Sequence, residues 1–207
     1  MNQPIRILIV DDHPLLQEGI VMVVEHEPDM QVVGSAATGR ESIALCERLQ
    51  PNLVLMDLRL PDISGIDAMI AIRAKWPTVK VILLTTFAGD AEVNRALKAG
   101  AAGYLLKTMP RKQIVESIRQ IHAGRRRIDP GVAANLAEHM GLETLSQREV
   151  EILKQVAEGN RNKEIAHQFA LSEETIKSHM KNILEKLGAS DRTQAVSIAV
   201  RRGIMQL

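Results

Sequence analysis

Short apolar runs alternate with longer amphipathic stretches over the first 123 residues of the chain. Runs of this length suit strands buried on both faces, and the stretches between them have apolar residues at the helical spacing of about 3.6. Alternating strands and helices predict an α/β domain, a doubly wound five-stranded parallel sheet with helices on both faces. The predicted strands are Ile5–Val10, Val32–Ala36, Leu53–Met56, Val79–Leu84 and Tyr104–Leu106.

The pattern from residue 144 onward contains helices only. Ser146 and Glu149 form a capping-box signature at the start of a helix that stops at Gly159. A short helix over residues 162–170 precedes a turn in which Ser172 caps a third helix. A short helix, a tight turn and a longer helix predict a small all-α helix-turn-helix domain, whose second helix enters the major groove of DNA.

The third helix of this domain is amphipathic. Its apolar face is formed by Ile176, Met180, Ile183, Leu184 and Leu187. Polar side chains occupy its other faces, where they could meet DNA: Lys177, Ser178, Lys181 and Asn182.

Helix-breaking residues and charge separate the two patterns. Gly124 opens a segment with three successive arginines, Arg125–Arg127, and Val132, Leu136 and Met140 then suggest a short helix ending near Gly141. The arginines could contact DNA phosphates or the acidic face of the first domain, but we favour solvated linker charge. We therefore expect a first domain, an interdomain linker and a second domain at residues 1–123, 124–143 and 144–207.

Acidic residues follow two of the predicted buried strands. Asp11 and Asp12 end the first strand, and Asp57 ends the third. Open α/β sheets bind ligands outside the carboxyl ends of their strands, so the three acids share one pocket if these strands are neighbours. Their mutual repulsion would raise at least one pKa unless a cation neutralises them. Mg²⁺ prefers a few carboxylates together with water and phosphate oxygens, so we expect a magnesium site.

Two further strand ends add a hydroxyl and an ammonium group. Thr85 follows the fourth strand and Lys107 follows the fifth. A carboxylate nucleophile, a hydroxyl, an ammonium and a metal pocket are the groups that phosphoryl transfer requires. The chain has neither GxxxxGK[ST] nor GxGxxG, which disfavours nucleotide binding through those motifs, so we expect another protein to be the phosphoryl donor.

Composition narrows the classes of function. Four aromatic residues in 207 argue against a stacking platform for single-stranded nucleic acid. No apolar run approaches the roughly 20 residues of a membrane span, so we expect a cytoplasmic protein without a membrane partner. Residues 1–123 carry 13 Lys and Arg against 14 Asp and Glu, net −1, and residues 124–207 carry 13 against 11, net +2. This weak basic field predicts weak DNA binding by one copy and favours a dimer.

The first domain resembles the receiver domain of bacterial two-component response regulators. The resemblance spans roughly residues 4–123 and rests on the acids, Pro61, Gly65, Thr85 and the segment Ala99–Lys107. It implies that Asp57 accepts the phosphoryl group and that Asp11, Asp12, Asp57 and the backbone carbonyl of Arg59 hold Mg²⁺. It also implies that Thr85 and Lys107 bind phosphoryl oxygens and that Thr85 and Tyr104 form the switch. Tyr104 could instead be a plain half-buried strand aromatic.

The second domain resembles the LuxR-type output domain of the NarL/FixJ group. The matching segments are Leu145–Glu149, Gly159–Ala166, Ser172–His179 and Leu187–Ala195. The resemblance implies that Lys177, Ser178 and Lys181 read base edges and that the last helix, Thr193 to Arg202, pairs protomers. It also implies a set of contacts to the DNA backbone, made by Asn162, Lys163, Thr175 and Arg192.

Together these features predict a phosphorylation-activated transcriptional regulator rather than an enzyme. Its expected partners are a sensor histidine kinase, double-stranded promoter DNA and, when phosphorylated, a second copy of the chain, with RNA polymerase as a possible further partner. Three alternatives compete with this interpretation. They are a receiver-regulated RNA-binding antiterminator, a phosphorylation-independent interaction module and a hydrolase, which fits poorly because signalling needs the acyl phosphate to outlive the transfer.

Overall fold

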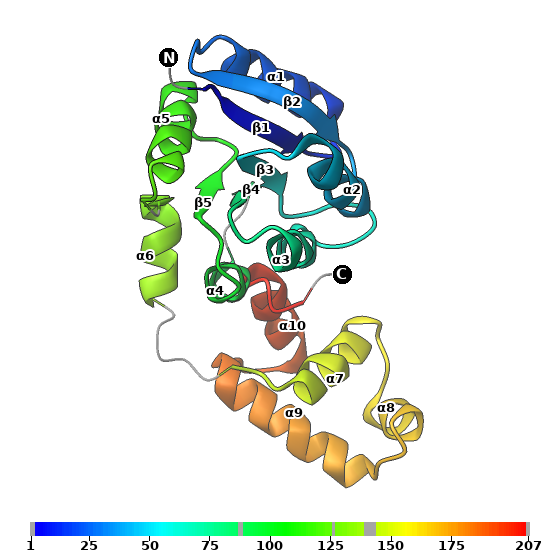
Figure 1. Ribbon diagram of the computed structural model, residues 1–207. Coiled ribbons are helices and arrows are strands. Elements are labelled where there is room, and N and C mark those ends of the chain that lie inside the picture. The colour runs from blue at the N-terminus through cyan, green and yellow to red at the C-terminus, as the bar shows by residue number, and fades with distance from the viewer. Residues whose placement is uncertain (1–2, 87–88, 126, 139–143, 206–207) are drawn as a thin grey trace. The chain divides into compact units, whose positions relative to one another are not determined.

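The structure is a computed structural model that describes residues 3–86, 89–125, 127–138 and 144–205. The chain divides into two compact units, one that contains the sheet and most of its helices and one that contains the residues from 135 onward together with residues 89–92 (Figure 1). None of the described helices has the length and apolar character needed to cross a lipid bilayer.

The first unit is built on a parallel sheet with the strand order β2-β1-β3-β4-β5-β6. The chain first adds β2 on one side of β1 and then adds β3 and the later strands on the other side. This reversal of the strand order at β1 makes the fold doubly wound, as the alternating pattern predicted. β3 is buried along its whole length, which explains its continuous apolar sequence. The first five strands are β1 (Ile5–Val10), β2 (Met30–Ala36), β3 (Leu53–Asp57), β4 (Lys80–Thr85) and β5 (Gly103–Leu106).

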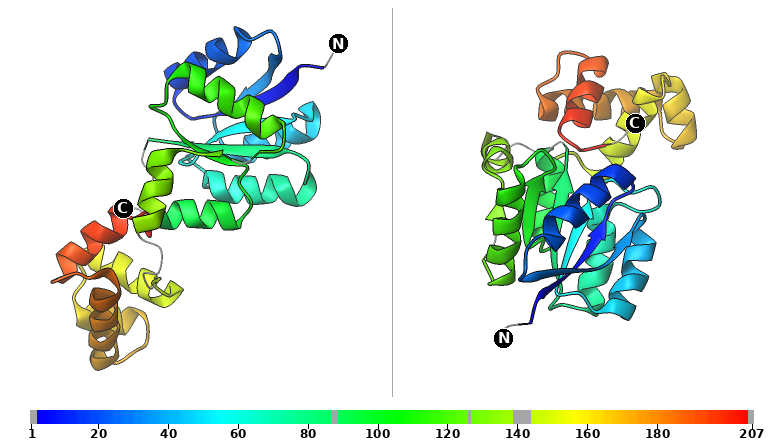
Figure 2. Two further views of the ribbon diagram at one scale, coloured as in Figure 1. Left: turned by 90° about the vertical axis from the view of Figure 1, so that its left-hand side faces the viewer. Right: turned by 90° about the horizontal axis from the view of Figure 1, so that it is seen from above.

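Helices cover both faces of this sheet (Figure 2). On one face, Ile20 and Val24 of α1 and Ile114 and Ile118 of α5 pack against alternate strand residues in one buried cluster. This burial removes most of the apolar area of these four side chains from water and fixes α1 and α5 on one face of the sheet. The helices are α1 (Pro14–Glu25), α2 (Gly39–Leu49), α3 (Gly65–Lys75), α4 (Asp90–Lys98) and α5 (Arg111–His122).

A sixth strand, β6 (Arg127–Ile128), extends the sheet beyond the five predicted strands. Gly124 has φ +91°, a conformation that favours glycine, and there the chain turns after α5 toward the free edge of β5. Gly103 leaves room for it, since a Cβ there would lie 3.1 Å from the Arg127 carbonyl oxygen. The helix-breaking residues and arginines around β6 gave no strand pattern, so the sequence did not predict it. The expected linker helix is found as α6 (Pro130–Glu138), whereas Met140 and Gly141 lie outside the described residues.

The second unit has the predicted helix-turn-helix arrangement. Ser146 and Glu149 form the expected capping box, Gly159 with φ +91° follows the first helix, and Ser172 caps the long helix by accepting from the Thr175 N–H. The apolar residues of that helix, among them Ile176 and Ile183, lie in a buried cluster shared by all four helices. These helices are α7 (Gln147–Ala157), α8 (Asn162–Gln168), α9 (Glu173–Leu187) and α10 (Arg192–Arg201).

Candidate functional site

Asp11, Asp12 and Asp57 lie close together at the carboxyl ends of β1 and β3. These strands are parallel neighbours with Val10 opposite Met56, so the residues that follow leave the sheet at the same edge. One oxygen from each of Asp11, Asp12 and Asp57 and one ring nitrogen of His13 lie within 4.8 Å of one another. The structure thus brings together the three carboxylates that the sequence placed at strand ends.

His13 has no role in the sequence-based interpretation, although it directly follows the two acids. Its Nδ1 lies 2.8 Å from Asp12 Oδ1 and 3.3 Å from Asp11 Oδ1, and its backbone N–H donates to Asp11 Oδ1 at 3.0 Å. Pro14 begins α1 immediately afterwards, because its fixed φ and missing N–H suit the first helical position. The acids are therefore confined to the short turn between β1 and α1.

Lys107 supplies the positive charge of the site. Its Nζ lies 2.7 Å from Asp11 Oδ2 and 2.8 Å from Asp57 Oδ2, and its side chain is only 5% exposed. β5 aims it at the acids, and its backbone N–H donates to the Thr85 carbonyl at 2.7 Å, which fixes the point where the chain leaves the sheet. A buried ammonium between two buried carboxylates is strongly held, since removing the ammonium would leave both carboxylates buried without a cation.

Burial dominates the electrostatics of Asp57, which is 4% exposed. It raises the pKa of the Asp57 carboxyl above its ordinary value, while Lys107 lowers that pKa, Asp11 raises it and a hydrogen bond from the Arg59 backbone lowers it again. The ionised Asp57 is thus held in an environment that solvates it incompletely. A bound cation would stabilise this ionised carboxylate, and covalent modification would remove it.

A divalent cation fits the donor set. Three ionised carboxylates and one ammonium give the pocket a net charge near −2, and the ligand atoms are hard oxygens at mutual distances that one ion could span. Asp11, Asp12 and Asp57 could hold such an ion. Arg59 follows β3 at this edge with its backbone N–H toward Asp57, and the role of its carbonyl stays a prediction.

Gly65, the first residue of α3, lies directly against the backbone of Asp57. A Cβ at this position would lie 2.0 Å from the Asp57 carbonyl oxygen, so the chain needs glycine there. The Gly65 N–H donates to the Leu58 carbonyl at 2.9 Å, and Ser64 caps α3 by accepting from the Asp67 N–H. The sequence pattern identifies Gly65 only as a helix breaker, whereas the structure also makes it a packing requirement beside Asp57.

The two predicted switch residues lie on adjacent strands. Thr85 ends β4 and Tyr104 lies within β5, and the strand register pairs Thr85 with Leu106 and Tyr104 with Leu83. Both side chains are buried, Tyr104 completely. The Tyr104 carbonyl accepts a hydrogen bond from the Asp129 N–H at 3.0 Å, just after β6. The strand that carries Tyr104 is therefore bonded directly to the chain that leaves the first unit.

The predicted DNA contacts of the second unit lie on α8, α9 and the start of α10. Lys177, Ser178, Lys181 and Asn182 are exposed on α9, opposite its buried face. Lys177 Nζ lies 3.4 Å from Glu174 Oε2, and Lys181 Nζ lies 3.8 Å from Glu185 Oε1. These pairs are exposed and weak, so they would yield readily to a phosphate or a base.

The predicted backbone contacts have mixed surroundings. Lys163 is exposed in the first turn of α8, Asn162 beside it is half-buried, and Thr175 Oγ1 lies 2.8 Å from Ser172 Oγ in the cap of α9. The Arg192 guanidinium donates to the Asn160 carbonyl at 2.7 Å, which ties α10 to the loop before α8. Arg192 thus has a structural partner that the sequence did not suggest.

One buried ion pair fixes α9 against α7. Lys186 Nζ lies 3.0 and 2.8 Å from the two carboxylate oxygens of Glu149, whose side chain is 5% exposed. Hydrogen bonds from Lys186 and Ser146 lower the pKa of the Glu149 carboxyl more than burial raises it. The sequence identified Glu149 only as a capping residue, and nothing in the spacing pointed to Lys186 as its partner.

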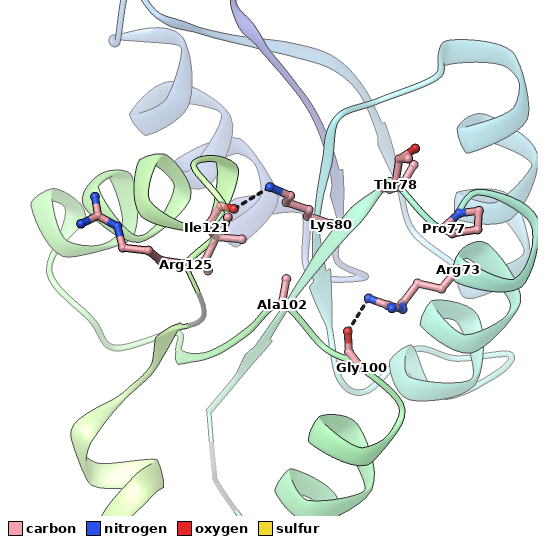
Figure 3. Close-up of a pocket in the computed structure, with 10 residues that line it drawn as sticks. Arg73, Pro77, Thr78, Lys80, Gly100, Ala102, Ile121 and Arg125 are labelled. Carbon is pink, nitrogen blue, oxygen red and sulfur yellow. Dashed lines mark hydrogen bonds between the residues drawn. The ribbon is translucent and has the colours of Figure 1, made fainter.

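A cavity of about 460 Å³ lies at the other end of the strands from the acids, beside the start of β4. Its lining includes the side chains of Lys80 and Arg73, which donate hydrogen bonds to backbone carbonyls (Figure 3). Lys80 Nζ donates to the carbonyls of Ile121 at 3.0 Å and His122 at 2.8 Å, and Arg73 donates to the Gly100 carbonyl. These bonds satisfy the last carbonyls of α5 and the turn after α4, which is a structural role.

Comparisons with known proteins identify the family of each unit. Residues 7–119 match the family model of the response regulator receiver domain, and residues 143–199 match that of the bacterial regulatory proteins of the luxR family. The chain is 40% identical over 207 residues to the response regulator protein VraR of Staphylococcus aureus, covering 98% of this chain and 99% of VraR.

Solved structures of response regulators resemble the chain as well. The response regulator ChrA of a heme-sensing two-component system has a TM-score of 0.60 and 32% identity, covering 99% of this chain and 100% of that one. The two-component response regulator RcsB in its complex with DNA has a TM-score of 0.72 and 25% identity, covering 96% of this chain and 99% of that one.

Proposed function

We propose that Asp57 is the phosphoryl acceptor of this protein. The chain belongs to the bacterial response regulators with a LuxR-type DNA-binding domain and is a phosphorylation-activated transcription regulator. The observation that carries this proposal is the pairing of a buried Asp57 carboxylate with Lys107 at 2.8 Å, beside Asp11 and Asp12 at the edge where β1 and β3 end. Asp11 is buried as deeply and also pairs with Lys107, so the choice of Asp57 as the acceptor rests on the resemblance to the receiver family.

The proposed transfer begins from a phosphohistidine of a sensor histidine kinase. An Asp57 carboxylate oxygen attacks the phosphorus, the bond from phosphorus to the histidine nitrogen breaks, and an acyl phosphate remains on Asp57. Lys107, 2.8 Å from Asp57 Oδ2, stays in place to pair with a phosphoryl oxygen, and the Thr85 hydroxyl supplies a hydrogen bond to another.

The proposed metal ligands are Asp11, Asp12, Asp57 and the Arg59 backbone carbonyl, and the proposed ion is Mg²⁺. When bound, it would neutralise charge on the phosphoryl oxygens as they approach the acids. Asp11 is held by Lys107, whereas Asp12 is exposed and can turn toward an ion. The hard oxygen donors and the net negative charge of the pocket support this choice of metal.

We assign the output to the second unit. Lys177, Ser178, Lys181 and Asn182 are the proposed groups at the base edges, and a further set holds the DNA backbone. The structure of RcsB with DNA supports duplex DNA as the ligand, so an RNA-binding antiterminator is not favoured. The proposed backbone contacts are Asn162, Lys163, Thr175 and Arg192.

The proposed signal passes from the receiver, residues 1–123, through a linker, residues 124–143, to the DNA-binding domain, residues 144–207. Thr85 and Tyr104 are the proposed switch, phosphorylation favours a homodimer, and RNA polymerase is a further proposed partner at the promoter in the cytoplasm. The complete acidic set with Lys107 argues against a phosphorylation-independent module, and no hydrolase role is proposed. Slow loss of the phosphoryl group to water is compatible with signalling.

Mass spectrometry after incubation with Mg²⁺ and a small phosphodonor tests the acceptor. The wild-type protein should gain one phosphoryl group, and Asp57→Asn should gain none because an amide is not a competent nucleophile. Asp29→Asn is the matched control, since it removes a carboxylate that pairs with Arg119 outside the pocket. A phosphoryl adduct that persists on Asp57→Asn would move the acceptor to another residue.

Sedimentation with beryllofluoride, which mimics an acyl phosphate, tests the dimer. The wild-type protein should associate when Mg²⁺ and beryllofluoride are both present, and Asp57→Asn should not respond. Two copies place two recognition helices on one site, which raises affinity as tethering raises effective concentration. An activated protein that stays monomeric while binding DNA more tightly would refute the dimer.

A further inference from the structure

Gln17 of α1 ties together the ends of two strands beside the acidic pocket. Its side-chain Nε2 donates to the Asp11 carbonyl at 3.1 Å and to the Ala36 carbonyl at 2.9 Å. The Asp11 N–H donates to the same Ala36 carbonyl at 3.0 Å. The half-buried Gln17 amide thus uses its N–H groups to join the carboxyl ends of β1 and β2, at the backbone of Asp11 itself.

We propose that Gln17 is a positioning residue that sets the orientation of the Asp11–Asp12 peptide and thereby the affinity of the pocket for a divalent cation. This inference rests on the proposed metal site. A carbonyl held by a hydrogen bond fixes the plane of its peptide group, because that plane is rigid. The Asp11 carbonyl belongs to the peptide that leads into Asp12, so Gln17 determines where the Asp12 side chain begins.

The two acids differ in how much they need this support. The Asp11 carboxylate is buried and held by Lys107 at 2.7 Å, so its side chain is placed independently of Gln17. The Asp12 carboxylate is 34% exposed and pairs with His13, whose side chain is 70% exposed. Mobile surface groups position each other poorly, so Asp12 depends on its backbone for its approach to a cation.

A purely structural role for Gln17 makes a different prediction. Ile20 and Val24 already bury α1 against the sheet, so loss of the two hydrogen bonds should lower stability without unfolding the protein. If Gln17 only pins α1, the folded protein should bind Mg²⁺ as before. If it orients Asp12, the affinity for Mg²⁺ should fall while the chemistry at saturating Mg²⁺ is retained, since Asp57 and Lys107 are untouched.

The experiment compares Gln17→Met, which keeps the side-chain length and removes both donors, with Gln31→Met at an exposed position of β2. Calorimetry measures the Kd for Mg²⁺ on the full chain, and phosphorylation by a small phosphodonor is followed across Mg²⁺ concentrations. For Gln17→Met we expect a rise in Kd of about tenfold, at the lower end of the effect of groups behind metal ligands. The half-saturating Mg²⁺ concentration should rise in step, with an unchanged maximal rate. Gln31→Met should match the wild-type protein.

An unchanged Kd in a folded Gln17→Met variant would overturn the proposal, whatever its stability. So would a lower maximal rate with an unchanged Kd, because Gln17 would then act on the acceptor and not on the metal ligands. Failure of the wild-type protein itself to bind Mg²⁺ would refute the metal site and the Mg²⁺-dependent phosphorylation proposed for Asp57, an outcome distinct from a wild-type-like Gln17→Met.

Discussion

Replacing Asp57 by asparagine should make the receiver more stable at pH 7 when no divalent cation is added. Burial raises the pKa of the Asp57 carboxyl above its ordinary value of 3.8 in spite of the opposing effect of Lys107. The ionised form is therefore less stable in the folded state than in the unfolded state. Asparagine keeps the shape and removes this charge, and Lys107 keeps its ion pair with Asp11 at 2.7 Å.

The gain should be about 1 kcal/mol, within the range of roughly 0.5–2 kcal/mol for single stabilising substitutions. A domain of this size would then unfold about 3–5 °C higher. The pH dependence follows from the sign of the shift. A raised folded-state pKa means that the penalty is absent below about pH 3.8 and grows as the pH rises through the folded-state value. The difference between Asp57→Asn and the wild-type protein should therefore shrink as the pH is lowered.

Trp76 makes the measurement specific to the receiver. It is the single tryptophan of the chain and follows α3, so its fluorescence in urea reports on this domain, while the helical domain contributes none. Asp29→Asn is a control of opposite sign, because hydrogen bonds from Arg119 lower the pKa of the Asp29 carboxyl. Asp29 is exposed, so its loss should cost well under about 1 kcal/mol.

Two results would refute this reasoning. If Asp57→Asn is less stable than the wild-type protein at pH 7, the ion pair with Lys107 outweighs the cost of burial. If the stability difference is the same at pH 7 and in acid, its cause is not the ionisation of Asp57. Added Mg²⁺ should also stabilise the wild-type protein more than the variant, because the ion binds the folded state through this carboxylate.

Three further predictions concern the output domain and its linker. Lys181→Ala should weaken DNA binding unevenly across a library of binding-site sequences, by about 1–3 kcal/mol at the bases it reads, whereas Lys163→Ala should weaken it uniformly; identical profiles would contradict the assignment. Glu149→Gln should destabilise this domain by about 1–2 kcal/mol, because Lys186, whose side chain is 24% exposed, loses its charged hydrogen-bond partner. The lowered pKa of Glu149 means that this stability is present above pH 4.5 and is lost as the pH falls through the folded-state value, which acid titration by circular dichroism would follow. The Asp129 amide should exchange slowly with deuterium because it donates to the Tyr104 carbonyl, and fast exchange would contradict that bond.

The sequence was sufficient for the parts of the site that periodicity and strand ends determine. A charged residue that follows a buried strand must reach solvent or a partner, so the apolar runs alone predict that Asp57, Asp11 and Lys107 lie at one edge of the sheet. Neighbouring positions of β1 and β3 could only be assumed, and the strand order supplies them. The predicted roles of Arg59 and Thr85 rest on family resemblance and stay predictions.

Features that depend on long-range contacts left little or no trace in the sequence. β6 is two residues long and paired through its backbone, so no side-chain pattern predicts it. Gln17 acts through its amide on the carbonyls of two strands that are separate in sequence, and a glutamine on an amphipathic helix is typical of a surface position. Lys186 and Glu149 are 37 residues apart, and their pairing follows only from how α7 packs on α9.

Charge on the recognition helix explains why the output domain should depend on a second copy. Lys177 and Lys181 each have a glutamate neighbour on α9; these exposed pairs are weak, but the two glutamates lower the net positive charge of the helix. The salt dependence of DNA binding scales with the number of phosphates neutralised, and one copy offers few unbalanced cations for this. Base-reading contacts discriminate between sequences but cannot replace that missing attraction. Pairing two domains on one site would double the contacts without adding charge to either, so in the proposed mechanism phosphorylation would control DNA binding by promoting association.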